Sequence, residues 1–299
     1  MSILIVCYLR PGGLKAILEN FIGSGRRIYI FIDNASAEYK EKNLEVLRIA
    51  EDFQSKLHIT ILHSTTNLGV GRAVPTAIDW ISSHETSFII LEDDCHITPH
   101  GLDFLERSSS LLLGKVTLIS ATSPWDLLEG KHKNKVVTTS SYPLISGWAT
   151  STENWSEISF LIGMKPPYLK SLLFLLRKPG KLLPVCFFLA AHIKVYKGEL
   201  KAWDCSLALA MLLKSKIALI PNITTVTNTG RDDVASHTVP IIGEDTIFRK
   251  ASEVEVSEVV AFGFQDRKDT DRQIEDELYG LGPRNMLSPL KALLTKLDH

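Results

Sequence analysis

The chain lacks several features that would place it quickly in a class of protein. Its 299 residues include four cysteines, and their spacing is not that of a metal site. No stretch reaches the roughly 20 apolar residues that a membrane-spanning helix needs. No basic leader precedes the short apolar run at the start, so we expect no signal peptide. These absences favour a cytoplasmic protein with reduced thiols, in which matches to the glycosylation pattern arise by chance.

The chain also lacks a strong charge of either sign, an internal repeat and a low-complexity tract. Its formal net charge is -1, which argues against a protein that binds nucleic acid over a large surface. The apolar content of 45% is ample for a sizeable core. One large α/β domain or two small ones would fit this length.

Apolar runs alternate with amphipathic stretches in the first third of the chain. The runs at residues 3–7, 27–32 and 57–63 are short and rich in β-branched residues, which predicts strands. Helical spacing of apolar residues separates them, at residues 14–22 and 37–54. This βαβαβ order predicts a parallel, right-handed, doubly wound sheet.

An apolar run at residues 87–91 leads directly into Glu92, Asp93 and Asp94. The pattern predicts a buried strand with three carboxylates at its carboxyl end, where ligands bind in open α/β sheets. Clustered carboxylates repel one another unless a cation lies between them, and Mg²⁺ or Mn²⁺ bridging phosphates would meet that need. An acidic, solvated loop is the alternative.

Three further patterns each carry a functional and a structural interpretation. The glycine-rich turn from Asn67 to Arg72 could grip a phosphate, but it fits neither the Walker pattern nor the dinucleotide fingerprint. Gly147 and Trp148 could form a wall for a sugar ring or pack a corner of the core. Asp204 lies at a helix start, so it could act as a general base or cap the helix.

Residues 160–201, here called the basic flap, differ in composition from the rest of the chain. They hold eight Lys or Arg residues against Glu199, interleaved with leucine and phenylalanine. Prolines at 166–167, 179 and 184 are expected to break the flap into short helices. Such segments could lie on an anionic membrane or form a solvated basic face. Residues 286–297 predict an amphipathic helix with the same two alternatives.

The patterns above stand in an order that resembles GT-A fold glycosyltransferases, and is similar to bacterial family 2-like sugar transferases and inverting N-acetylglucosaminyltransferases. The matching segments are Tyr8-Leu9-Arg10-Pro11, Glu92-Asp93-Asp94, Gly147-Trp148-Ala149-Thr150, and Trp203-Asp204 followed by a polar loop. The resemblance spans roughly residues 3–238, without the flap. It implies a Rossmann-like α/β domain at 1–240, with a mixed, mainly parallel sheet flanked by helices, and an extension at 241–299.

The resemblance also implies roles for individual residues. Asp94 would hold Mn²⁺ or Mg²⁺, with His237 as a further contact to the metal or diphosphate. Asp204 would be the catalytic base. Sugar contacts would come from Gly147, Trp148 and Trp203. The residues that would bind the nucleotide donor are Tyr8, Arg10, Asp33, Asn67, Arg72, Glu92 and Asp93.

The sequence departs from the family at two places. Leu9 stands where the family has an asparagine, which bears on base recognition, and Cys205 and Ser206 replace acidic or aromatic residues, which bears on the acceptor. The expectation is an inverting, metal-dependent transferase that moves a sugar from a nucleoside diphosphate, a UDP-sugar first, to a hydroxyl of a bacterial surface glycan or lipid-linked acceptor. It would work in the cytoplasm or at the inner face of the membrane. A sugar-nucleotide nucleotidyltransferase and a non-catalytic binding protein are the rivals.

Overall fold

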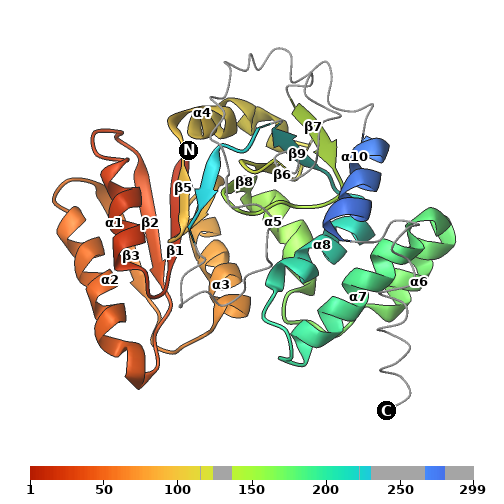
Figure 1. Ribbon diagram of the computed structural model, residues 1–299, viewed down its shortest axis with the longest axis horizontal. Coiled ribbons are helices and arrows are strands. Elements are labelled where there is room, and N and C mark those ends of the chain that lie inside the picture. The colour runs from red at the N-terminus through yellow and green to blue at the C-terminus, as the bar shows by residue number, and fades with distance from the viewer. Residues whose placement is uncertain (115, 124–136, 222, 230–266, 280–299) are drawn as a thin grey trace.

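The computed structural model describes residues 1–114, 116–123, 137–221, 223–229 and 267–279. Its centre is an eight-stranded sheet of order β3-β2-β1-β4-β8-β6-β9-β7 (Figure 1). The pairs among β1, β2, β3 and β4 are parallel, whereas β8 runs antiparallel to β4 and β6. The strands of this sheet are β1 (Ser2–Cys7), β2 (Arg27–Ile32), β3 (His58–His63), β4 (Ser87–Glu92), β6 (Leu118–Ser120), β7 (Val137–Ser140), β8 (Trp148–Ser151) and β9 (Ala218–Pro221).

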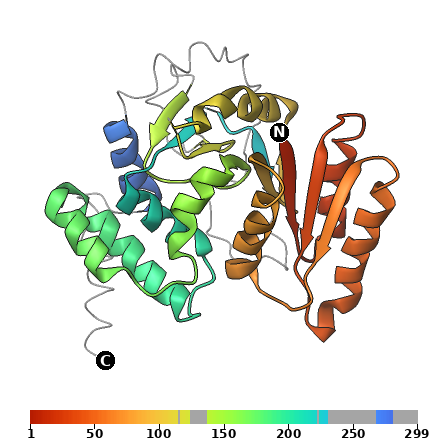
Figure 2. The ribbon, with the colours of Figure 1, turned by 180° about the vertical axis from the view of Figure 1, so that it is seen from behind.

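Helices cover both faces of the sheet (Figure 1, Figure 2). The α-helices are α1 (Pro11–Glu19), α2 (Lys40–Phe53), α3 (Val70–Ser82), α4 (Pro99–Arg107), α5 (Thr152–Ile158), α6 (Tyr168–Arg177), α7 (Leu182–Tyr196), α8 (Trp203–Lys214) and α10 (Arg267–Gln273). Short 3₁₀ segments lie at η1 (Ala37–Tyr39), η2 (Ser108–Leu112), η4 (Ser159–Leu161) and η5 (Pro179–Lys181), and η6 (Ile274–Leu278) is a π-helix.

Alternation along each strand divides the core between the two faces. Ile3 and Ile5 pack with buried residues of α1, α2 and α4, while Leu4 and Val6 pack with α3, α5, α7 and α8. The full length of β1 is buried for this reason, and its residues form a continuous apolar run instead of an alternating one. Burial on two faces fixes the register of β1 and therefore the positions of the residues that follow it.

The strand order reverses its direction at β1. The chain moves outward from β1 to β2 and β3, and then returns to place β4 on the other side of β1. The carboxyl ends of β1 and β4 therefore flank a topological switch point, where α/β sheets bind their ligands. The prediction of a mainly parallel, mixed sheet flanked by helices is confirmed.

A second, two-stranded sheet lies at this switch point. It pairs β5 (Cys95–Ile97) with β10 (Val226–Asn228) in antiparallel fashion. Neither strand was predicted from the sequence, nor were β7 and β8, because three or four residues carry too little periodicity to be recognised. The pairing brings residue 229 beside the acidic turn.

Two helix boundaries differ from the sequence predictions. Helix α1 begins at Pro11, three residues before the expected start, because proline is well suited to the first position of a helix. Pro184 was expected to break the flap, but it lies in the first turn of α7, where its missing N–H costs no hydrogen bond. In the described part of the chain, no helix is long and apolar enough to cross a membrane.

The described part of the extension packs against the main domain. Asp271 of α10 accepts hydrogen bonds from the Ser140 hydroxyl (3.0 Å) and from the Ser141 backbone (2.7 Å). Tyr279 lies against the rings of Tyr142 and Phe188, with centroids 5.5 and 5.0 Å away. The predicted amphipathic helix at residues 286–297 lies outside the described residues.

Candidate functional site

The loop after β1 and the turn after β4 are joined by charged hydrogen bonds. The backbone N–H of Tyr8 donates to Asp93 Oδ2 (2.8 Å), and Arg10 Nη1 donates to Asp93 Oδ1 (3.1 Å). The same nitrogen lies 3.3 Å from Asp94 Oδ2. Arg10 thus connects the two turns that flank the switch point, and the structure brings together Tyr8, Arg10, Asp93 and Asp94, which the resemblance assigns to the donor and metal.

Gly13 permits this close approach. A Cβ atom at Gly13 would lie 2.0 Å from the backbone oxygen of Asp93, far inside van der Waals contact. The first turn of α1 therefore packs directly on the acidic turn and holds Arg10 against it. Gly12, its neighbour in the same helix, has nothing within 4 Å of a Cβ. Of these two glycines, only Gly13 lies where a side chain would clash with a neighbouring segment.

Burial and mutual repulsion make the acidic turn costly to ionise. Burial, together with the charges of Asp94, Asp93 and Asp204, raises the pKa of Glu92 to about 8, against a lowering by Arg10. Burial also raises the pKa of Asp93 to about 6, although the Tyr8 N–H and Arg10 oppose that rise. A second cation at this turn would relieve the repulsion.

Asp204 approaches the acidic turn from a distant part of the chain. It is the second residue of α8, and Ala202 occupies the N-cap position, so the alternative of Asp204 as the helix cap is wrong. Its side chain is exposed, yet its charge raises the pKa of Glu92 and, after burial, that of Tyr279. A carboxylate at a helix start thus lies within electrostatic reach of the carboxylate at the end of β4.

Strand β10 fixes the other side of the acidic turn. The backbone N–H of Thr229 donates to the carbonyl oxygen of Asp94 (2.9 Å), and its hydroxyl lies 3.3 Å from the same oxygen. The beginning of the predicted polar loop therefore returns to the acidic turn. His237 belongs to that loop but lies outside the described residues.

Asp33 has a structural task at the same edge of the sheet. Its two oxygens accept the backbone N–H groups of Leu68 (2.8 Å) and Gly69 (2.9 Å). Asn67 in turn donates to the Tyr8 hydroxyl (3.2 Å). The glycine-rich turn is thereby tied to the residues that follow β1 and β2, so the structure brings Tyr8, Asp33 and Asn67 together. Both oxygens of Asp33 are engaged in holding the turn.

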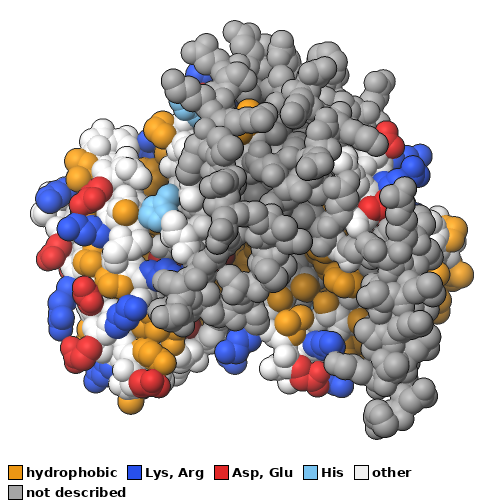
Figure 3. Space-filling model, in the orientation of Figure 1, with side chains coloured by type: hydrophobic (Ala, Val, Ile, Leu, Met, Phe, Trp, Pro, Cys, Tyr) orange, Lys and Arg blue, Asp and Glu red, His pale blue; other side chains and the backbone are white. Residues whose placement is uncertain are grey.

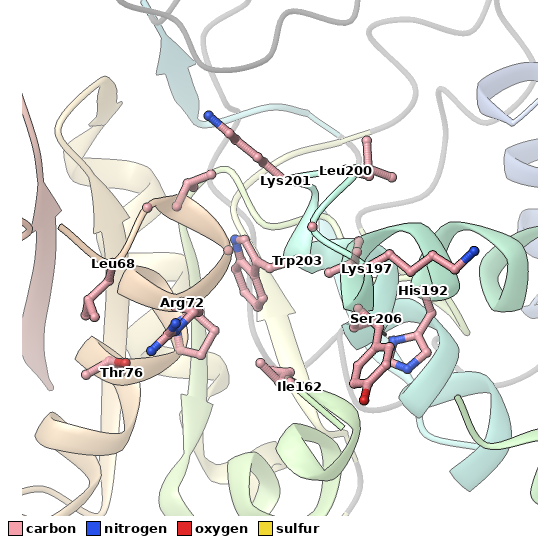
Figure 4. A pocket seen from close by; sticks show the side chains of 18 of the residues that line it. Leu68, Arg72, Thr76, Ile162, His192, Lys197, Leu200, Lys201, Trp203 and Ser206 are labelled. Carbon is pink, nitrogen blue, oxygen red and sulfur yellow. Dashed lines mark hydrogen bonds between the residues drawn. The ribbon is translucent and has the colours of Figure 1, made fainter. Parts of the chain in front are cut away.

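Arg72 lines a pocket of about 690 Å³ between α3 and the α7–α8 region (Figure 4). Lys197, Lys201 and Trp203 line it from the opposite side. Together with Arg72, the two lysines give the pocket three cationic side chains. Gly69 at its rim has φ +70°, a conformation that other residues adopt only with strain. The pocket can accept an anionic or sugar-like group next to the glycine-rich turn.

The sequence reading missed a buried polar pair on the wall of this pocket. His192 Nδ1 lies 2.9 Å from the Ser206 hydroxyl, and both side chains are buried. Burial lowers the pKa of His192, which keeps the ring neutral at pH 7. No sequence signal could have found the pair, because α7 and α8 meet only in the fold.

The tryptophans do not form the open sugar wall that was one interpretation of the sequence. Trp148 is 1% exposed and Trp203 3%, and both pack against Trp155 with centroids 6.4 Å apart. Packing in the core, the other interpretation, describes Trp148. Gly147, with φ +71°, is close to Leu91 and Val226 and fits a tight corner. Trp203 alone of these also lines the pocket.

The acidic turn fits a cation that a ligand would share. Among the described residues, no group of three or more His, Cys, Asp or Glu side chains could hold a metal by itself. Mg²⁺ commonly takes one or two carboxylates and completes its shell with phosphate oxygens and water. Tyr8 and Arg10 hold both oxygens of Asp93, at 2.8 and 3.1 Å, whereas Arg10 lies 3.3 Å from one oxygen of the more exposed Asp94, so Asp94 is the better ligand of the two.

Comparisons with known proteins add no family to this description. A scan against protein-family models found no match, and a search of curated proteins found none either. The functional argument therefore depends on the arrangement of the site.

Proposed function

We propose that the chain is a GT-A fold, inverting glycosyltransferase that uses a divalent metal ion and a nucleoside diphosphate sugar, with a UDP-sugar as the first candidate. The acceptor would be a hydroxyl of a bacterial surface glycan or a lipid-linked glycan. One observation carries the proposal: Arg10 and the acidic turn meet at the switch point of the sheet, within electrostatic reach of Asp204.

The reaction assigns a separate task to each group. Asp204 would accept the proton of the acceptor hydroxyl while the oxygen of that hydroxyl forms a bond to the anomeric carbon of the donor. The bond from that carbon to the diphosphate oxygen breaks, and the nucleoside diphosphate leaves with the electron pair. A metal on Asp94 would stabilise the charge that develops on the diphosphate. Arg72, at the pocket, would bind the same group.

The rival enzyme class has less support. A sugar-nucleotide nucleotidyltransferase needs a glycine-rich, basic loop after the first strand. Here only Tyr8, Leu9 and Arg10 separate β1 from α1, and the two glycines belong to the helix. The non-catalytic rival, a protein that only binds nucleotide or glycan, differs from a transferase in turnover and is tested below.

The proposal is tested by measuring donor binding and hydrolysis across a panel of nucleotide sugars, with Mn²⁺ and then with chelator. We expect metal-dependent binding of one UDP-sugar, weakened at least about 100-fold by Asp94→Ala. Asp103→Ala is the control, since that aspartate lies on the surface of α4 and pairs with Arg107 of the same helix. If no nucleotide sugar binds the wild type under either condition, the proposal fails.

A further inference from the structure

The outer side of α6 carries a stripe of leucines that no described residue covers. Leu169, Leu172, Leu173 and Leu176 are 46 to 72% exposed, while Ser171 on the opposite side is buried. Spacings of three, four and seven residues put the leucines on one side of the helix. Single exposed leucines are ordinary on a protein surface, but a continuous stripe marks an interaction surface.

Cations gather beside this stripe. Figure 3 shows hydrophobic side chains at the edge of the molecule over α6 and Lys and Arg side chains next to them, near α10. A pocket of about 490 Å³ lies between the two helices. Its lining includes the end of α6 and five cations, which are Lys178, Lys181, Arg267, Lys268 and Arg272.

The acids in that pocket are already engaged. Asp271 and Glu275 both pair with Lys181, at 3.2 and 2.8 Å. Within the described ranges, Arg267, Lys268 and Arg272 make no ion pair. Five cations against two acids give the described lining of this pocket a positive balance, and Phe174 lines it from α6, on a different side of the helix from the leucines.

We propose that α6 and this cationic pocket dock the protein on an anionic phospholipid surface. The leucines would enter the boundary between headgroups and acyl chains, and the cations would meet lipid phosphates. A second copy of the chain fits less well. A two-fold interface would bring the basic flap, with eight cations and one acid, against itself. Docking does not depend on the proposed transferase activity.

The test is co-sedimentation of the full chain with phosphatidylcholine vesicles that contain either no or about one-third phosphatidylglycerol. We expect binding to the anionic vesicles alone, and weaker binding at high salt. Leu172→Asp with Leu176→Asp should weaken it at least about 30-fold. Lys268→Gln with Arg272→Gln should weaken it about 30-fold, because each cation near the surface contributes about fivefold.

Matched control variants distinguish docking through α6 from non-specific adsorption to vesicles. Ile22→Asp with Leu113→Asp alters two exposed apolar residues elsewhere, and Lys42→Gln with Arg48→Gln removes two cations from α2. Both control proteins should bind like the wild type, and circular dichroism should show every variant folded. The proposal is overturned if the wild type does not bind anionic vesicles, or if the controls lose binding equally. It is also overturned if light scattering shows a dimer that the leucine variant dissociates.

Discussion

The turns after β2 and β4 both place aspartate at the carboxyl edge of the sheet, yet they do opposite things with it. Asp33 gives both oxygens to backbone N–H groups, those of Leu68 and Gly69. The turn after β4 instead collects Glu92, Asp93 and Asp94 around one arginine. The carboxylates in the turn after β4 repel one another. In the described part of the chain, no other carboxylate is among the groups that shift the pKa of Asp33.

This difference separates a structural carboxylate from candidate catalytic ones. A buried acid whose two oxygens each accept a backbone N–H stabilises the fold and has less capacity left for a ligand. A cluster in which negative charge exceeds positive charge costs folding free energy, and it persists where a bound cation or substrate compensates it. The expected effects of substitution differ accordingly.

The largest effect is expected from the carboxylate that faces the cluster from α8. Asp204→Asn should lower turnover about 1,000-fold and leave donor affinity within about twofold, because it removes a proton acceptor without removing a donor contact. Initial rates and isothermal titration with the donor measure the two quantities. A variant with undiminished turnover would exclude Asp204 as the base, and a wild type with donor binding but no turnover would favour the non-catalytic rival.

Gly13→Ala tests whether the acidic turn depends on its contact with α1. The added Cβ would lie 2.0 Å from the Asp93 carbonyl oxygen, so helix and turn must separate. We expect a loss of about 3 kcal/mol in the free energy of unfolding, measured with urea. Gly12→Ala should be neutral or stabilise by about 0.5–1 kcal/mol, since its Cβ meets nothing. Equal effects of the two substitutions would contradict the packing argument.

Glu92→Gln probes the charge within the turn through pH. The folded protein holds the pKa of Glu92 at about 8, above the ordinary 4.5, so the folded state binds more protons than the unfolded state between these values. Stability from this group is complete below pH 4.5 and is lost as the pH rises through 8.

The glutamine variant should therefore be about 2 kcal/mol more stable than wild type at pH 8 and should match it near pH 4.5. The difference at pH 8 is smaller than the full pKa shift would give, because the Glu92 side chain is partly exposed and solvent screens its charge. Urea unfolding at the two pH values measures the difference. An unchanged difference across this range would mean that Glu92 does not carry the repulsion.

Asp33→Asn tests the structural side of the comparison. The amide offers one acceptor oxygen in place of two, and its NH₂ group would face a backbone N–H of Leu68 or Gly69. We expect a loss of about 1–2 kcal/mol in unfolding free energy, with turnover at saturating donor nearly unchanged. Asp52→Asn, on the exposed side of α2, is the control. A collapse of turnover without loss of stability would assign Asp33 to the chemistry.

Local pattern was sufficient for the parts of the fold that local pattern controls. The strands β1, β2 and β4 were predicted because burial on both faces demands unbroken apolar runs. The same reasoning located Asp33 and the acidic turn, since polar residues that follow such runs must lie at the sheet edge.

Local pattern was enough to predict the α/β class, the ends of β1, β2 and β4, and the polar residues that follow them. The packing of distant elements was needed to show that Trp148 is buried in the core, that Asp204 lies within electrostatic reach of Glu92, and that Arg10 holds the acidic turn. The reason is that sequence periodicity depends on neighbouring residues, whereas these contacts join residues far apart in the chain. Periodicity reports burial within one element, whereas side-chain partners depend on how distant elements pack, and neither strand order nor helix rotation is written in the local pattern.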